Sequence, residues 1–415
     1  MSALIADDAA DRIDRRLMLA LAGLYLGQSI PIYLFAAAIP AIFRSVGVSL
    51  STIGFIALLM LPWMMKFLWA PWIDRYVLLP IGHRRSWILT TQAAIVILLL
   101  VLTQMSPVDV GAVPILLLGS AVSLLIGTLE VAIDGYAVAH LTARQRAFGN
   151  ALQGAGTAAG VVLGGSCVLF LYEARGWQVS VAAAAGMCAL SLVFLPLMRE
   201  DRHMRPAWAR PEDRPSLLRF FRRAGALEAL SFALIYRLSE GFVKAMENPF
   251  LIDNGLSLKD IGILDGASAA IVGLLGSGLA ALIIRITGLW RFVYGLGIAR
   301  TLCFIGFAYY AWAAPNLPWF LIGITLFNTV IRYMEIVGLY TVFMGLAVKE
   351  QAGTDFTLLS SAQLVVFMLG SMASGVIADW IGYDGLFALA VILSVVGLVL
   401  SMRALPRRHS AWSGR

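Results

Sequence analysis

The sequence predicts an all-α polytopic membrane protein with twelve transmembrane helices in two halves of six and both termini in the cytoplasm. The first of three observations behind this prediction is composition. Apolar residues of the AVILMFWYC set make up 60% of the 415 residues, and only 13% of the residues are charged. A soluble domain contains about 25% charged residues and about 45–50% apolar residues with glycine included. A soluble enzyme therefore has no place to bury this much apolar surface.

The second observation is a series of apolar segments, each near the roughly 20 residues that a helix needs to cross a bilayer. In the first half they cover 17–38, 51–72, 86–105, 111–135, 147–171 and 178–198. In the second half they cover 225–250, 260–284, 289–312, 317–346, 354–381 and 384–402. Prolines inside them are tolerated because neighbouring helices satisfy the freed backbone groups. The predicted domains are a six-helix bundle at 1–198, a cytoplasmic linker at 199–224 and a second bundle at 225–415.

The third observation is the distribution of positive charge. Cytoplasmic loops of membrane proteins are enriched in Lys and Arg. With both termini inside, most of the 31 Lys and Arg residues fall on the cytoplasmic side, whereas Arg44, Arg175 and Lys259 fall in outer loops. Topology therefore explains the net charge of +7, and no nucleic-acid partner is expected. The three cysteines lie in apolar stretches without metal or disulfide spacing, and no cofactor or protein-bound metal is expected.

The two halves resemble each other faintly. Gly164 corresponds to Gly370, and Gly176-Trp177 corresponds to Gly382-Tyr383, each pair in a glycine-bearing helix followed by a short turn. Two sets of six spans suggest parallel repeats, and transporters of this kind bind substrate near mid-bilayer between the halves.

The seventh span is the richest in charge. Arg237, Glu240, Lys244 and Glu247 fall within an arc of about 80° on one helix. Charged side chains inside a membrane usually face a cavity or a partner. The functional interpretation is a helix that lines a cavity and binds an anionic or polar substrate. The structural alternative is ion pairing in which the two acids and two bases neutralise one another.

The tenth and fourth spans carry further polar groups. Asn328, Arg332 and Glu335 share an arc of about 60° in the tenth span. Glu130 and Asp134 lie one turn apart in the fourth, and two carboxylates this close suppress each other's ionisation. One of them is expected to keep its proton near neutral pH, as a proton-coupled carrier requires. The alternative places Asp134 at the cytoplasmic interface, paired with a loop arginine.

Other polar residues inside spans are isolated in the sequence. Lys66 comes late in the second span and can snorkel to the cytoplasmic face. Arg300 is nearer mid-span and is expected to face a cavity. Gln28 and Gln153 can bond either a substrate or a neighbouring helix. The glycines of the fifth span, Gly156, Gly160 and Gly164, are spaced for close helix packing.

The loop after the second span carries Asp74-Arg75 and then Arg84-Arg85. These charges can pair across the cytoplasmic ends of helices and hold one conformation, so they are the predicted gating residues. Their spacing resembles the loop signature of the major facilitator superfamily.

Other functional classes fit the sequence less well. An intramembrane enzyme needs a nucleophile–base pair or a metal cluster, and the four histidines lie in loops or at span ends. A channel needs rings of pore-lining residues. A sensor or scaffold leaves the charged stripe of the seventh span without a purpose.

The resemblance is carried by several segments. They are Lys66–Pro71, Asp74–Tyr76, Gly82–Trp87, Ile235–Glu240 and Thr354–Ser361. These segments resemble the muropeptide-permease and acetyl-CoA-transporter branch of the superfamily. The compact length, however, is similar to that of the small siderophore permeases of the pyochelin and rhizobactin type.

The resemblance implies a permease of the bacterial inner membrane, monomeric, that imports a ferric siderophore by proton-coupled alternating access. The iron would travel within the chelate. A muropeptide permease, a carrier of another organic anion, and export remain open. The expected substrate-binding residues are Arg237, Lys244, Arg332, Arg300, Asn328, Gln28 and Gln153. The expected proton-coupling residues are Glu240, Glu335, Glu130, Asp134 and Glu247.

Overall fold

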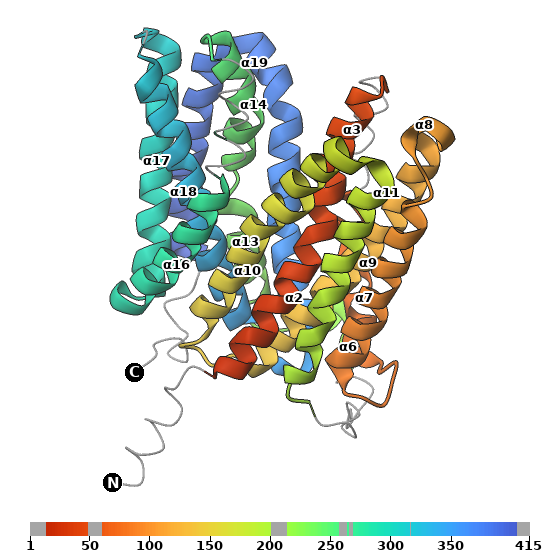
Figure 1. The fold of residues 1–415 in the computed structure, drawn as a ribbon. Coiled ribbons are helices and arrows are strands. Elements are labelled where there is room, and N and C mark those ends of the chain that lie inside the picture. The colour runs from red at the N-terminus through yellow and green to blue at the C-terminus, as the bar shows by residue number, and fades with distance from the viewer. Residues whose placement is uncertain are drawn as a thin grey trace. The chain divides into compact units, whose positions relative to one another are not determined.

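A computed structural model describes residues 14–48, 60–200, 214–256, 264, 269–315 and 317–404. All the regular elements within these ranges are helical, so the predicted all-α class is confirmed (Figure 1). The starts of the predicted spans 51–72 and 260–284, the outer-loop Lys259 and half of the predicted linker lie outside the described residues.

The chain divides into two compact units. One comprises Met1–Pro215 and Ala347–Thr354, and the other comprises Ser216–Leu346 and Asp355–Ser413. The division at 215 falls inside the predicted linker 199–224, while a short segment from late in the chain joins the first unit. The predicted domain boundaries themselves stay a prediction.

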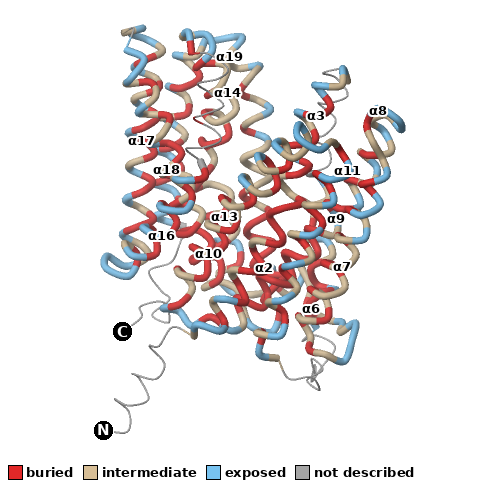
Figure 2. The backbone as a smooth tube through the Cα atoms, in the orientation of Figure 1, coloured by how far each residue is buried: buried red, intermediate tan, exposed pale blue. Residues whose placement is uncertain are grey.

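The first unit is built from helices that follow one another with short connections. They are α2 (Arg15–Tyr33), η1 (Leu34–Ala38), α3 (Ile39–Ser45), α5 (Met60–Met64), η3 (Met65–Leu68), α6 (Ala70–Arg75), α7 (His83–Leu102), α8 (Pro107–Val110), α9 (Ala112–His140), α10 (Arg146–Gly160), η4 (Val161–Ser166), α11 (Cys167–Leu190), η5 (Ser191–Leu197) and η8 (Lys349–Gln351). Buried residues extend along α2 and through most of the second half of α9 (Figure 2).

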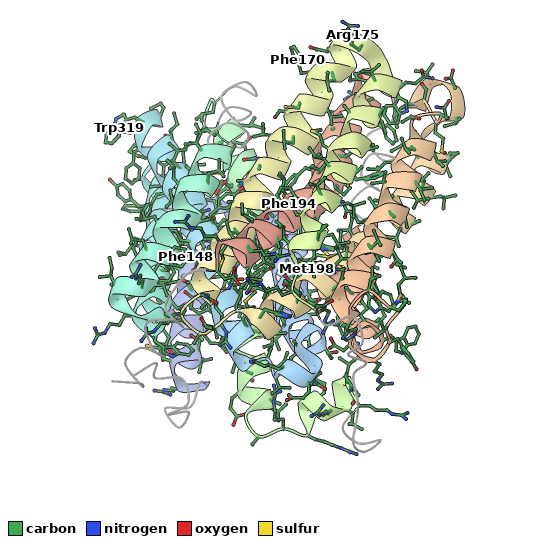
Figure 3. All side chains as sticks on the ribbon, turned by 60° about the horizontal axis from the view of Figure 1, so that its bottom comes forward. Phe148, Phe170, Arg175, Phe194, Met198 and Trp319 are labelled. Carbon is green, nitrogen blue, oxygen red and sulfur yellow. The ribbon has the colours of Figure 1, made fainter. Side chains whose placement is uncertain are left out.

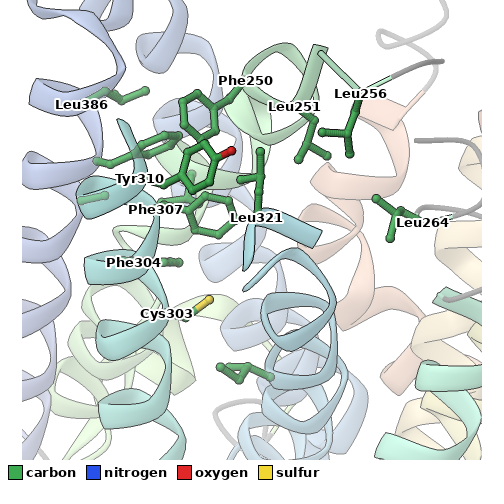
Figure 4. Packing of buried hydrophobic residues seen from close by; sticks show 14 residues of the cluster. Phe250, Leu251, Leu256, Leu264, Cys303, Phe304, Phe307, Tyr310, Leu321 and Leu386 are labelled. Carbon is green, nitrogen blue, oxygen red and sulfur yellow. The ribbon is translucent and has the colours of Figure 1, made fainter. Parts of the chain in front are cut away.

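The second unit has fewer and longer elements. They are α12 (Leu217–Phe221), α13 (Ala226–Ile235), α14 (Glu240–Asp253), α16 (Ala269–Thr287), α17 (Leu289–Ala313), α18 (Pro318–Leu346) and α19 (Ala352–Ala404), of which the first residues belong to the other unit. An aromatic cluster forms part of its core, where Phe250 packs edge-on against Phe307, Tyr310 and Phe387 (Figure 4).

Eight helices among the described residues are long and apolar enough to cross a membrane. Two of these stretches, Arg146–Leu197 and Lys349–Arg403, have 52 and 55 residues, more than twice the length of one crossing. Each is interrupted by a glycine with positive φ, Gly176 (φ 80°) and Gly382 (φ 73°). These are the two glycines that the sequence comparison of the halves paired. Gly82 (φ 120°) and Gly288 (φ 86°) likewise precede α7 and α17, so the resemblance between the halves extends to backbone conformation.

Helices α2 and α10 approach each other closely in the first unit. A Cβ added to Gly156 would lie 3.0 Å from the backbone of Tyr25, and one added to Gly160 would collide with Ser29. Both helices continue into π-helical stretches, η1 and η4. The predicted packing role of these glycines is therefore confirmed. Phe194 lies against Gly23 on another side of α2 (Figure 3).

The seventh apolar segment is not one continuous helix, in contrast to the single helical arc expected from the sequence. Helix α13 ends at Ile235 and α14 begins at Glu240. Between them, Leu238 and Glu240 donate their N–H groups to carbonyls three residues back, at 3.2 and 3.1 Å. The freed carbonyl of Tyr236 accepts from Arg300 Nη2 at 2.7 Å. The break is thus stabilised by a buried side chain of another helix.

Many large apolar side chains on the long helices are exposed, including Leu117 (69%) and Trp319 (69%, Figure 3). A soluble protein of this size would not expose so many such side chains on regular helices. This surface matches helices that face lipid.

Candidate functional site

The helix break in the second unit positions a buried charge network. Arg237 lies in the break, and its guanidinium binds both oxygens of Glu240, the first residue of α14. Arg332 of α18 binds the same carboxylate through Nε at 2.7 Å. The pairing of Arg237 with Glu240 confirms the expected neutralisation within this stripe, and Arg332 adds a second cation from another helix.

A second carboxylate, Glu335 of α18, continues this network. Arg300 of α17 donates to its Oε1 at 2.9 Å, and the Tyr236 hydroxyl lies 3.3 Å from the same atom. Arg237 Nε is 4.0 Å from Oε2, which has no hydrogen-bond partner among the described residues. The network therefore joins three guanidinium groups to two carboxylates and carries excess positive charge.

A smaller network lies one to two turns further along α14. Lys244 Nζ binds Glu247 Oε1 at 2.6 Å, as expected for neutralising neighbours. Asn328 of α18 donates to the other oxygen of Glu247 at 2.6 Å. Asn328 and Arg332, which share a face of α18, thus contact different acids of α14.

Exposure separates the cations that can meet a solute from those that cannot. The side chains of Arg332 and Lys244 are 27% and 21% exposed, whereas Arg300 is 1% exposed. Arg300 also donates to the Tyr236 carbonyl and contacts Ser394 at 3.4 Å. Its partners are all internal, in contrast to the cavity-facing position expected from the sequence.

In the first unit, Glu130 of α9 forms a buried ion pair with Lys66 of η3. Trp63 Nε1 donates to the same carboxylate oxygen, and the Lys66 ammonium lies 5.1 Å from the Trp63 ring centroid. Lys66 is 1% exposed. The expectation that Lys66 can snorkel to the cytoplasmic face is wrong, because the buried glutamate holds its ammonium inside the unit.

Asp134, one turn after Glu130, has a different environment. The Tyr25 hydroxyl donates to Oδ1 at 3.0 Å, and Gln153 Nε2 lies 3.5 Å from the same atom. Oδ2 is buried and has no hydrogen-bond partner among the described residues. The sequence alternative in which Asp134 lies at the interface and pairs with a loop arginine is wrong, since its side chain is fully buried and contacts α2 and α10.

The two predicted glutamines differ in their surroundings. Gln153 contacts Asp134, whereas Gln28 is 4% exposed, and neither Gln28 Oε1 nor Gln153 Oε1 has a partner among the described residues. Gln153 therefore belongs to the Asp134 group, and nothing in the described part of the chain connects Gln28 to a charged network.

The four predicted gating residues lie together at the ends of α6 and α7. Asp74 binds the guanidinium of Arg84 and accepts three hydrogen bonds from the start of α19, from Gly353 N at 3.3 Å, Thr354 N at 2.7 Å and Thr354 Oγ1 at 2.6 Å. Gly135 admits the Arg84 guanidinium, which a Cβ there would meet at 2.6 Å. Asp74 thus binds the first residues of α19, which belong to the same unit.

Glu200 stabilises the same corner. Its two carboxylate oxygens accept from the backbone N–H groups of Arg84 and Arg85 at 2.9 and 2.8 Å, at the first turn of α7, where unpaired N–H groups favour an anion. Arg85 also donates to the Met198 carbonyl, and Arg75 donates to the Pro215 carbonyl at 2.5 Å.

Sequence reasoning missed several contributors to these networks. Trp63 and Tyr25 donate to buried carboxylates, and the Tyr236 hydroxyl, which donates to the Val293 carbonyl at 2.6 Å, lies beside Glu335. Thr354 and Glu200 bind the loop charges or their backbone. Trp63 was detectable, since it lies one helical turn before Lys66. The others approach from distant parts of the chain.

Comparison with known proteins agrees with this architecture. A family model described as Major Facilitator Superfamily matches residues 17–364. "Putative transporter AmpG 4" of Rickettsia felis is 23% identical over 388 residues, which cover 90% of this chain and 93% of that protein. "Anhydromuropeptide permease" of Escherichia coli K12 is 25% identical over 397 residues, which cover 90% and 76%. A solved bacterial homologue of the iron transporter ferroportin, in an outward-facing state, has a TM-score of 0.72 at 16% identity, covering 97% of this chain and 100% of that one. That likeness is one of fold alone.

The relatives confirm the resemblance to the muropeptide-permease branch. Membership of a transporter family makes the chain a permease rather than an enzyme, and the apolar helices fit a multi-pass protein of the bacterial inner membrane. Because the family model spans most of its length, the chain belongs to the Major Facilitator Superfamily.

Proposed function

We propose that this permease imports anhydromuropeptides or closely related peptidoglycan fragments into the cytoplasm. The observation that carries the proposal is the cation-rich network of the second unit, in which Arg332 and Lys244 keep exposed area. A peptidoglycan fragment carries peptide carboxylates, and guanidinium groups bind carboxylates in a fixed two-bond geometry. The relative named as an anhydromuropeptide permease supports the same substrate class.

Chain length no longer favours a siderophore over a muropeptide. The sequence argument for siderophore import rested on compactness, yet relatives named AmpG align over 93% of their own length with this chain. The names of the reported relatives support the muropeptide alternative and do not mention a siderophore. Siderophore import stays a prediction, as does transport of another organic anion.

In the proposed mechanism Arg332 and Lys244 contact the substrate, while the buried side chains of Asn328 and Arg237 hold Glu247 and Glu240 in place. Arg300 acts indirectly, since its donors hold Tyr236 and Glu335 in place. Release of Glu240 by Arg332 when substrate arrives would exchange one carboxylate partner of Arg332 for another, and the negative charge of the substrate would compensate the excess positive charge of the network.

Coupling to the proton gradient is proposed to act through Asp134. Glu240, Glu335, Glu130 and Glu247 each contact a cation. Asp134 has hydroxyl and amide neighbours instead, and one of its oxygens is unpartnered within the described residues. A proton on that oxygen would neutralise the carboxylate at low cost.

The proposed topology has twelve crossings in one monomeric chain, with both termini in the cytoplasm. The stretches interrupted at Gly176 and Gly382 supply two crossings each, and the segments around α5–α6 and α13–α14 supply one each. Transport follows alternating access. The contacts of Asp74 with Arg84 and Thr354 would form and break as the cytoplasmic side closes and opens, with Arg75 and Arg85 assisting.

The test is uptake of tritium-labelled anhydromuropeptide by Escherichia coli cells that lack their own anhydromuropeptide permease and express this chain. A parallel arm uses ferric pyochelin labelled with radioactive iron, and both arms are run with and without a protonophore. Arg332→Ala is compared with Arg291→Ala, because Arg291 is an exposed arginine of the same unit.

We expect muropeptide uptake that is sensitive to the protonophore. Arg332→Ala should reduce this uptake about tenfold, which corresponds to the loss of one charge-assisted hydrogen bond. Arg291→Ala should transport at the wild-type rate. Iron uptake without muropeptide uptake would replace the proposal with the siderophore prediction. Equal uptake by both variants would remove Arg332 from the binding surface.

A further inference from the structure

Glu130, one turn before Asp134 on α9, has two close partners in the first unit, Lys66 and Trp63. The ammonium of Lys66 and the indole N–H of Trp63 both bind Glu130 Oε2. The ammonium also lies over the Trp63 ring, 5.1 Å from its centroid, where the face of an indole attracts a cation. Both side chains of the pair are at most 5% exposed, so water contributes little to their stabilisation.

The backbone is built for this approach. Gly127, on α9 just before Glu130, would place an added Cβ 3.2 Å from Lys66 Cβ and 3.4 Å from Trp63 Cα. Lys66 lies on the short 3₁₀ stretch η3, between α5 and α6. Trp69, which follows this stretch, donates through Nε1 to Thr128 Oγ1 of α9 at 3.0 Å. Two tryptophans and a lysine of one segment thus contact a single turn of α9.

We propose that Lys66 is a positioning residue for proton coupling: it fixes Glu130 as a permanent anion, so that Asp134 alone exchanges the proton. Among the described residues, the side chains that contact this pair of carboxylates are Lys66 and Trp63 from η3 and α5, Tyr25 from α2, and Gln153 from α10. Lys66 is the cation of this described group, and its ammonium binds Glu130. The inference rests on the proposed coupling role of Asp134 and adds the residue that makes the two carboxylates unequal.

The inference is tested without substrate, by measuring the melting temperature of the purified protein between pH 5 and pH 8. Lys66→Met leaves a buried carboxylate without its cation, and such a group must take up a proton to remain buried. We expect this variant to melt about 5 °C below the wild type at pH 8, with a gap that closes toward pH 5. Lys66→Arg, which keeps the charge, should show a smaller gap at pH 8 and little change of that gap with pH.

The double variant Lys66→Met with Glu130→Gln decides the interpretation. It removes both charges, so its melting gap should not depend on pH. A gap that is the same at all pH values in Lys66→Met, or a double variant as pH-dependent as the single one, would overturn the inference. Because no substrate is used, the result does not depend on whether the chain transports muropeptides.

The double variant also separates Lys66 from the proton site in a transport measurement. Proton-driven accumulation of the tritium-labelled muropeptide should persist in the double variant. If it is lost while exchange of internal for external substrate continues, Glu130 itself carries the proton and the inference is wrong. If neither variant nor wild type transports this probe, the substrate proposal fails and the melting experiment still stands.

Discussion

At the scale of single residues, contacts at short sequence spacing behaved as the sequence predicted. Arg237 pairs with Glu240 and Lys244 pairs with Glu247, three residues apart in each case. Two charged residues that are isolated in the sequence, in contrast, have ion-pair partners in the structure. Lys66 and Arg300 are both buried and bind a glutamate on a neighbouring helix. An unpaired charge inside a membrane protein is costly, so its partner must come from elsewhere in the fold.

Asp134→Asn tests the proposed coupling site. Asparagine keeps the size of the side chain but cannot bind and release a proton, so accumulation driven by a pH gradient should fall at least about tenfold, whereas substrate exchange across the membrane continues. The measurement is uptake of labelled muropeptide into proteoliposomes. Asp109→Asn, an exposed acid of α8 in the same unit, is the matched control. Wild-type accumulation in the Asp134 variant would exclude this residue from coupling.

At the scale of elements, glycines decide where helices touch and where they end. Gly156 and Gly160 let α10 approach α2, while Gly176 and Gly382 interrupt α11 and α19 with positive φ. The two glutamates Glu130 and Glu335 occupy similar positions in α9 and α18, both helices of 29 residues. Glu130 is paired with Lys66 of η3, whereas Glu335 is paired with Arg300 of α17. The two halves therefore share the position of the glutamate but take its cation from different helices.

Gly160→Ala tests the contact between α2 and α10. The added methyl group would collide with Ser29, and overpacking of this kind costs about 1–3 kcal/mol. Gly186→Ala is the control, because a Cβ there meets nothing within 4 Å and alanine favours a helix more than glycine does. Thermal unfolding should show a lower melting temperature for the first variant only. Equal melting temperatures of the Gly160→Ala and Gly186→Ala variants would contradict a tight contact between α2 and α10 at this position.

At the scale of the whole molecule, the distribution of arginines sets the topology that the proposed mechanism needs. The proposed twelve-crossing arrangement would place the ends of α6 and α16 in the cytoplasm and the starts of α9 and α18 outside. Exposed residues near these ends make the topology measurable, since a single cysteine can be labelled by a reagent that does not cross the membrane.

In a chain whose three cysteines are replaced by serine, Val108→Cys and Leu317→Cys should react in intact cells. Leu79→Cys and Thr287→Cys should react only after the membrane is permeabilised, because positively charged loops stay inside. All four positions are exposed in the structure. Labelling of Leu79→Cys in intact cells would contradict the proposed orientation.

The sequence by itself determined the all-helical class, the membrane setting, the residues of most helices and the repeat between the halves. These follow from local quantities, namely apolar length, charge distribution and glycine spacing, which each segment carries alone. Pairing of neighbours on one helix was also predictable, because helix geometry fixes which residues share a face.

Only the tertiary structure decided which charges are partners. The break at Tyr236–Ser239 is stabilised by Arg300, far along the chain, and the contact of Asp74 with Thr354 joins residues from opposite ends of the sequence. The same reason explains the surroundings of Lys66 and Asp134: Lys66 binds a buried glutamate, whereas the contacts of Asp134 among the described residues are a tyrosine and a glutamine. The partner of a buried charge depends on which helices pack together, and that choice is made by the whole chain.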